Sequence, residues 1–174
     1  RGRDIKRYGY DWAGLWIIGT FPVLNIDIDS YPAVKQHLLD FGKERLEQAG
    51  NTLPDGTKSR KKTSNKWFET QDQIGYYKEF EKEKIVFKEM VIDNAFSYDT
   101  HNCFSLDTSR IITGNHLKFL LAIFNSKLFF YCVKKFYGGG TLGNSGIRMK
   151  HTFFNDFCIT ENERLRLKLE SLVD

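Results

Sequence analysis

Glycine-rich residues 138–146 contain a pattern that matches a cofactor-binding motif. Gly138, Gly140 and Gly143 satisfy the G-x-G-x-x-G spacing of dinucleotide-binding folds. That motif needs a strand before the glycines and a helix after them, whereas here a helical pattern precedes them and none opens behind them. The phosphate-loop pattern also fails, because Asn144 stands where lysine is required. We therefore expect no nucleotide cofactor at this segment.

The acids, histidines and cysteines show no spacing that predicts catalysis or metal binding. A metal-dependent nuclease of the Pro-Asp type needs a downstream acid two positions before a lysine, and none follows Pro54-Asp55. The histidines are isolated from one another and from the cysteines: His37, His101, His116 and His151. The Gly-x-Ser-x-Gly elbow and the Asn/Asp-Pro-Pro-aromatic box of amino-methyltransferases are both absent. The sequence predicts no catalytic residue, metal ligand or cofactor on this chain; a nuclease with a dispersed site stays open as an alternative.

Residues 58–66 form a basic segment with no acid among its nine positions. Its cations are Lys58, Arg60, Lys61, Lys62 and Lys66. Hydroxyl and amide side chains, Thr63 and Asn65 among them, interleave with the cations, and Trp67 and Phe68 follow directly. This composition suits phosphate binding combined with hydrogen bonds to base edges. A solvated surface loop explains the same composition, so both interpretations remain open.

Length, charge and cysteine content restrict the class of protein. The chain has 174 residues, enough for one domain, and its formal net charge of +4 favours an anionic partner. Three cysteines, far apart and odd in number, predict no disulfide framework and favour a reducing, cytoplasmic setting. Asn125-Ser126-Lys127 interrupts the apolar run that surrounds it, so a membrane span is not expected. Because the chain starts at Arg1 rather than Met, we expect it to be a piece of a longer protein.

Apolar periodicity predicts a mixed α/β fold of the α+β class, with an antiparallel-rich sheet packed against helices. Strands are expected at residues 14–19, 84–91, 96–99, 103–107, 109–112 and 153–159. A first helix begins near Pro32 and ends before Gly50, and a capping box at residues 160–163 starts a last helix. Residues 115–136 predict a long buried helix, because apolar residues cover much of its circumference.

Several stretches of the chain together resemble one known family. The most characteristic is Thr113-Gly114 with Leu117, residues 120–123 and Asn125-Ser126-Lys127-Leu128, and residues 66–69 are similar to the family's Trp-aromatic-Glu element. Further similar stretches lie at residues 1–8, 31–38, 80–86, 157–159 and 172–174. The family is the TaqI-like C-terminal specificity domain, the target-recognition part of Type IIG restriction–modification enzymes. Cys158 departs from its pattern, since the family usually has proline there.

The resemblance implies a single target-recognition domain over residues 1–174, similar to half of a Type I specificity subunit. Residues 1–10 would enter it as a linker, and residues 161–174 would begin a terminal helix that is cut short. Its implied partners are double-stranded DNA and the methyltransferase and nuclease domains of a parent chain. That parent would methylate adenine at N6 with S-adenosylmethionine and cleave DNA with Mg²⁺, so neither cofactor is expected on this chain.

Two segments are the candidate DNA contacts, on the basis of residue type and position. The cations of the basic segment, Arg60 included, suit phosphates, whereas Asn144, Arg148, Thr63 and Asn65 suit base edges, with arginine matching guanine and asparagine matching adenine. The glycines of residues 138–146 allow a close backbone approach. The candidate contacts are Lys58, Arg60, Lys61, Lys62, Thr63, Asn65, Lys66, Thr141, Asn144, Arg148 and Lys150. The alternative function is a non-catalytic scaffold that docks other domains of the parent through exposed aromatic side chains.

Overall fold

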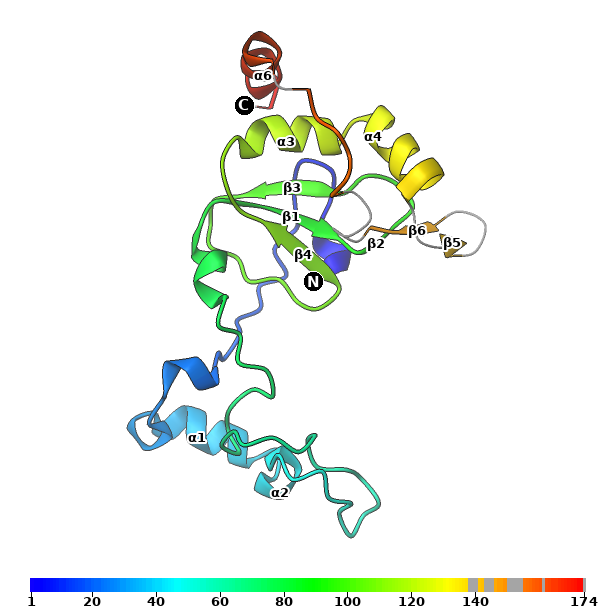
Figure 1. The fold of residues 1–174 in the computed structure, drawn as a ribbon. Coiled ribbons are helices and arrows are strands. Elements are labelled where there is room, and N and C mark those ends of the chain that lie inside the picture. Colours follow the sequence, from blue (N-terminus) through cyan, green and yellow to red (C-terminus); the bar gives the residue numbers. More distant parts are fainter. Residues whose placement is uncertain (138–140, 143–145, 150–154, 161, 174) are drawn as a thin grey trace. The chain divides into compact units, whose positions relative to one another are not determined.

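Two units make up the chain in this computed structural model, and each is described by itself (Figure 1). Unit 1 comprises Arg1–Leu15 and Lys78–Asp174, and unit 2 comprises Trp16–Tyr77. The structure describes residues 1–137, 141–142, 146–149, 155–160 and 162–173. That both units serve as one recognition domain stays a prediction.

A three-stranded antiparallel sheet lies at the centre of unit 1. Its strands are β1 (Lys84–Lys88), β3 (Phe96–Asp99) and β4 (Ser109–Ile112), in the order β3-β1-β4. The middle strand, β1, is buried along most of its length because it has a partner on each side and a helix across one face. These three strands confirm the predictions at residues 84–91, 96–99 and 109–112, although the first strand stops early. Residues 103–107 contain no strand, so that prediction is wrong.

A second antiparallel sheet continues from the end of the first. Glu89 separates β1 from β2 (Met90–Val91), which pairs with β6 (Gly146–Arg148), and β6 pairs with β5 (Thr141–Leu142). The register places Met90 opposite Arg148. The segment expected to be a glycine-rich loop therefore contains two short strands.

The helices in the described part of the chain are short. They are α1 (Pro32–Leu39), α2 (Lys43–Leu46), α3 (Leu117–Phe124), α4 (Lys127–Cys132) and α6 (Glu163–Glu170). Single helical turns are η1 (Gly2–Asp4), η2 (Pro22–Leu24), η3 (Ile28–Ser30), η4 (Tyr77–Glu81) and the π-type η5 (Val133–Tyr137). No helix among the described residues is long and apolar enough to cross a membrane. The mixed α+β class is confirmed.

Aromatic side chains fill the core of unit 1 between the first sheet and the helices. Helix α3 lies across one face of the sheet and packs on β1 and β3, with α6 on its other side (Figure 1). The rings of Phe87 and Phe96 stack with centroids 5.0 Å apart, and Phe124 and Phe129 lie 4.9 Å apart. Such pairs add to the burial of their large apolar surface, so this cluster joins sheet to helices.

Residues 115–136 do not form the long buried helix predicted from their periodicity. The helix stops at Asn125, whose buried side chain pairs with the main chain of Phe96 in β3: Oδ1 accepts from the Phe96 N–H (3.3 Å) and Nδ2 donates to the Phe96 carbonyl (2.9 Å). Ser126 then caps α4 by accepting from the Phe129 N–H (3.1 Å). Beyond the break the apolar side chains of Leu128 and Tyr131 are exposed.

Four other elements differ from their predicted form. Residues 14–19 are not a strand, and Trp16 is 87% exposed. The prediction is wrong because an apolar run alone does not distinguish a buried strand from an exposed connection. The expected first helix is two helices, because α1 ends at Leu39 and α2 begins after Gly42 (φ +86°), whose conformation other residues rarely adopt. Asn162, rather than Thr160, caps the last helix by accepting from the Leu165 N–H (2.9 Å). The described part of residues 153–159, from 155 onward, contains no strand.

The predicted entry linker packs against the sheet of unit 1. Ile5 is buried, and the N–H of Gly2 donates to Thr108 Oγ1 (3.2 Å). A side chain at Gly2 would meet that hydroxyl oxygen at 2.9 Å, so glycine permits this close approach. The N–H of Tyr8 donates to the Phe96 carbonyl (2.9 Å). The first ten residues are thus part of the folded unit.

A fully buried ion pair joins β1 to β3. Lys84 Nζ lies 2.5 Å from Asp99 Oδ2, and both side chains have no exposed surface. Burial raises the pKa of Asp99, but hydrogen bonds from Lys84, the His101 N–H and the Tyr10 hydroxyl outweigh it and leave the pKa below its usual value. Lys84 also donates to the Phe80 carbonyl (2.6 Å). Both charges therefore have the several partners that buried ions require.

Replacing Lys84 by methionine should lower the free energy of unfolding of unit 1 by about 3–5 kcal/mol, because Asp99 would remain buried without its cation. Urea unfolding followed by far-ultraviolet circular dichroism measures this loss. Lys82→Met is the matched control: its ammonium pairs with Glu79 at the surface and should leave the midpoint nearly unchanged. Equal midpoints for the two variants would contradict the role given to the buried pair.

Candidate nucleic-acid interface

The basic segment of unit 2 follows a tight turn. Asp55 Oδ1 accepts from the hydroxyl (2.6 Å) and the N–H (2.9 Å) of Thr57, which lowers the pKa of Asp55. Gly56 has φ +81°, and an isolated β-bridge joins Thr52 to Lys58 across the turn. This local structure places the side chain of Lys58 at the exposed start of the basic segment.

A buried amide holds the backbone of the basic segment. Gln48 is 6% exposed, and its Nε2 donates to the carbonyls of Lys66 (3.1 Å) and Glu69 (2.9 Å). Its Oε1 accepts from the Thr63 hydroxyl (2.5 Å), and its carbonyl accepts from the Thr63 N–H (3.0 Å). One side chain therefore binds residues 63, 66 and 69, and it fixes the backbone over the end of the basic segment.

Three of the predicted contact residues are bound to their own chain. Arg60 Nη1 donates to the carbonyl of Glu69 (2.9 Å), and Asn65 Nδ2 donates to the carbonyls of Thr70 (2.9 Å) and Gln71 (3.0 Å). The Thr63 hydroxyl is the one held by Gln48, and all three side chains are half-buried. The structure therefore gives them a part in holding the segment, whereas the sequence predicts base or phosphate contacts for them.

The remaining cations of the segment are exposed. They are Lys58, Lys61, Lys62 and Lys66. Lys61 and Lys62 have no ion pair or hydrogen bond from their ammonium groups within the part of the chain that the structure describes. Lys66 lies 3.9 Å from the buried Glu69 carboxylate and 5.6 Å from the ring of Phe68. Lys61 and Lys62, like Lys58, whose ammonium also has no such partner among the described residues, are thus open to an external anion.

Arg148 of unit 1 is held by a buried carboxylate that the sequence did not point to. Its Nε lies 2.6 Å from Glu89 Oε1, and Arg110 Nη2 lies 2.6 Å from Glu89 Oε2. The Glu89 side chain is 6% exposed and that of Arg148 is 44% exposed. Two guanidinium groups on one carboxylate leave a net positive charge at this point of the sheet.

The two arginines differ in how much of their hydrogen-bonding capacity the protein uses. Arg110 Nη1 donates to the carbonyls of Asp107 (2.6 Å) and Ser109 (3.0 Å), in addition to the Nη2 contact with Glu89. Arg148 is held through Nε, and its Nη1 and Nη2 have no partner among the residues that the structure describes. A guanidinium anchored in this way can present its terminal N–H groups to an acceptor pair, such as guanine O6 and N7 or phosphate oxygens.

The other predicted contacts of unit 1 are only partly covered by the structure. Thr141 lies in β5, opposite Ile147 of β6. Asn144 and Lys150 lie outside the described residues. Seven of the candidates belong to unit 2, and four, including Arg148, belong to unit 1.

Comparison with known proteins gives the family. Residues 1–151 match the family model described as the TaqI-like C-terminal specificity domain. The chain belongs to this family. Among curated proteins, no sequence matches it. Membership implies that the specificity domain takes part in recognising a DNA target in restriction–modification enzymes.

The matched region of this TaqI-like specificity domain contains some of the surface features described above and leaves out others. Residues 1–151 include the basic segment of unit 2 and the Glu89–Arg148 pair, whereas α6 follows the matched region. No group of histidine, cysteine, aspartate and glutamate side chains in the described ranges is arranged to hold a metal ion.

Replacing Glu89 by glutamine should lower the free energy of unfolding by about 2 kcal/mol, because the charge-assisted bonds to both arginines would weaken inside a buried site. Guanidinium chloride is unsuitable here, so urea unfolding at low salt should be used. Glu81→Gln, at an exposed position, is the matched control and should change little. If both variants unfolded at the wild-type midpoint, Glu89 would not be the anchor of Arg148.

Proposed function

We propose that this chain is a sequence-specific recognition domain for double-stranded DNA in a restriction–modification enzyme. It would position the duplex for adenine N6 methylation and for cleavage by other domains of the parent protein. The observation that carries the proposal is the family match over residues 1–151. The exposed lysines of unit 2 and the anchored Arg148 of unit 1 support it with the two kinds of contact that recognition needs.

In the proposed mechanism the exposed lysines bind phosphates. Lys58, Lys61 and Lys62 would contribute affinity that is independent of sequence and falls as salt rises, because each bound phosphate releases counterions. Arg60, Thr63 and Asn65 would support these lysines by fixing the backbone between them. The basic segment thereby contributes affinity and orientation rather than base choice.

Base readout is proposed for Arg148 and the residues around it. Its terminal N–H groups suit the O6 and N7 acceptors of guanine in the major groove, a pairing that discriminates by about 1–3 kcal/mol. Asn144, proposed for adenine, and Thr141 and Lys150 belong to the same stretch of chain and complete the proposed set. Anchoring of Arg148 by Glu89 reduces the conformational entropy that it would lose on binding.

The chemistry is proposed for other domains of the parent. A methyltransferase domain must turn the target adenine out of the helix, so the duplex has to be held firmly while that base leaves its stack. S-adenosylmethionine would bind in that domain, and Mg²⁺ would bind in a nuclease domain. The proposed share of this chain is to choose the site and to hold the duplex.

A second candidate function is a docking module within the same parent. The exposed apolar side chains of Ile17 and Ile18 in unit 2 favour it, because neighbouring exposed apolar groups can mark a protein-docking surface. Under this alternative the basic segment would be a solvated loop without a share in DNA affinity. The two functions therefore differ in what a charge reversal in that segment does.

Changing both Lys61 and Lys62 to glutamate in the full protein should weaken binding to a duplex selected from a random pool about 10-fold or more at 0.1 M salt, because two phosphate contacts become repulsive. The slope of log affinity against log salt should fall in magnitude by about 1–2. Fluorescence anisotropy at several salt concentrations measures both quantities.

The matched control changes Arg164 and Lys168 of α6 to glutamate, which alters net charge equally at exposed positions after the matched region. The control should keep the wild-type salt slope. An equal loss in both double variants would mean that overall charge, rather than the basic segment, sets the affinity.

A further inference from the structure

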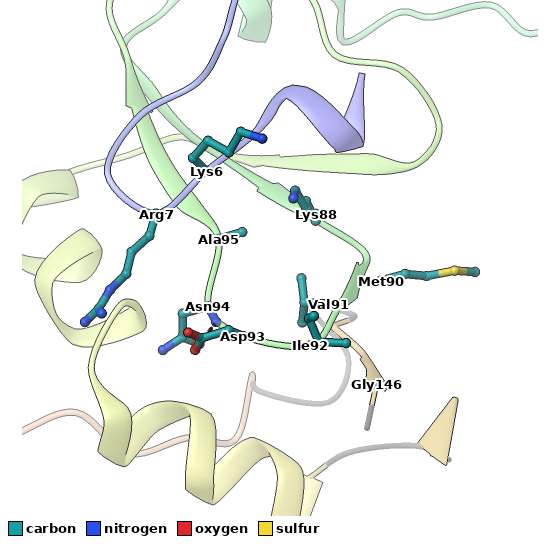
Figure 2. Close-up of a pocket in the computed structure, with 10 residues that line it drawn as sticks. All are labelled: Lys6, Arg7, Lys88, Met90, Val91, Ile92, Asp93, Asn94, Ala95 and Gly146. Carbon is teal, nitrogen blue, oxygen red and sulfur yellow. Dashed lines mark hydrogen bonds between the residues drawn. The ribbon is translucent and has the colours of Figure 1, made fainter. Parts of the chain in front are cut away.

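A hollow of about 450 Å³ lies in unit 1 beside the second sheet. Figure 2 shows its lining, which comes from the N-terminal arm, from the end of β1 through the residues before β3, and from β6. The lining residues are Lys6, Arg7, Lys88, Met90, Val91, Ile92, Asp93, Asn94, Ala95 and Gly146. Three of these are cations and one is an acid, so the hollow carries an excess of positive charge.

The fold brings the cations of the arm to this place through main-chain contacts. The N–H of Tyr8 donates to the carbonyl of Phe96 (2.9 Å), and Lys6 closes a turn with the carbonyl of Gly9 (2.7 Å). Arg7 Nη2 donates to the carbonyl of Asn125 (2.6 Å), which fixes its side chain at one wall of the hollow (Figure 2). Residues distant in sequence thus bring three cations to the lining, with the Arg7 guanidinium directed toward Asn125 and away from Lys88 (Figure 2).

Lys88 is the lining cation without a partner inside the protein, among the residues that the structure describes. It is the last residue of β1, it is half-buried, and its ammonium has no hydrogen bond or ion pair among the residues described by the structure. An ammonium without a partner in the protein keeps its hydrogen-bond donors for an anion in the hollow. Lys6, by comparison, has Asp11 within 3.7 Å.

The one acid of the lining, Asp93, offsets only one of its three positive charges. Asp93 is exposed, and its Oδ1 already accepts from the N–H of Asn94 (2.7 Å). The rim also carries exposed apolar side chains, Met90 (60%) and Ile92 (75%). A ligand that combines an anion with an apolar flank, as a phosphodiester does with its deoxyribose, matches this mixture.

We propose that the hollow binds a backbone phosphodiester of DNA, with Lys88 as its principal cation and Lys6 and Arg7 beside it. The inference rests on the proposed function and assigns it a further contact. Gly146 of the lining and Arg148 belong to the same strand, β6. A phosphate seated in the hollow would therefore set the register in which Arg148 meets a base edge, since phosphate contacts position a protein and base contacts specify the sequence.

The test uses the full protein and a duplex selected by the wild-type protein from a random pool. Lys88→Gln should weaken binding about 3- to 10-fold at 0.1 M salt and lower the magnitude of the salt slope by about 1, equally for all sequences. Lys168→Gln, an exposed lysine of α6, should match the wild type. Circular dichroism checks that each variant is folded, and Lys6→Gln repeats the test from the other side of the hollow with a smaller expected loss.

Three results would overturn the inference, and they differ in what else they overturn. If Lys88→Gln has wild-type affinity and salt slope while the Lys61/Lys62 variant is still impaired, the phosphodiester site in the hollow is overturned and the proposed function stands. A changed base preference at an unchanged slope in Lys88→Gln makes Lys88 a base contact instead of a phosphate contact. Absence of duplex binding by the wild-type protein overturns the proposed function and the phosphodiester site together.

Discussion

The side chain of Asn125 and the main chain of Phe96 form the contact on which the arrangement of unit 1 depends. Both groups are buried, and each hydrogen bond left unmade there would cost about 1–3 kcal/mol. The pairing stops α3, lets Ser126 start α4 in a new direction, and leaves the Asn125 carbonyl to accept from Arg7. The Phe96 carbonyl also accepts from Tyr8. Sheet, helices and N-terminal arm therefore meet at one pair of amide groups.

The basic segment of unit 2 shows how side chains of similar type take different roles. Asn65 and Arg60 donate to backbone carbonyls of the chain, and the Thr63 hydroxyl donates to the buried side chain of Gln48. Lys61 and Lys62 keep their charges in solvent on a backbone that these residues fix. A segment held in this way loses less conformational entropy on meeting a polyanion than a free loop would lose, which favours binding.

Buried carboxylates organise charge at two places in unit 1. Asp99 pairs with Lys84 in the core, where the pair joins two strands and neither charge reaches solvent. Glu89 lies where β1 passes into β2, and it holds Arg110 and the partly exposed Arg148. The first pair serves the fold alone, whereas the second leaves guanidinium donors at the surface. The difference follows from where each carboxylate lies, since Asp99 is the last residue of β3 and Glu89 lies between β1 and β2.

The sequence by itself determined the α+β class, the family resemblance and the strands at residues 96–99 and 109–112, because periodicity and short motifs are local properties. It also located the basic segment, whose exposed lysines need only be adjacent in the chain. Tertiary structure decided the break at Asn125 and the anchoring of Arg148, since their partners lie 29 and 59 residues away. It also decided that the apolar residues 14–19 form no strand and that Arg60 and Asn65 bind their own chain. A polar side chain is available to a ligand only when the fold leaves its hydrogen bonds unfilled, and no local pattern records that.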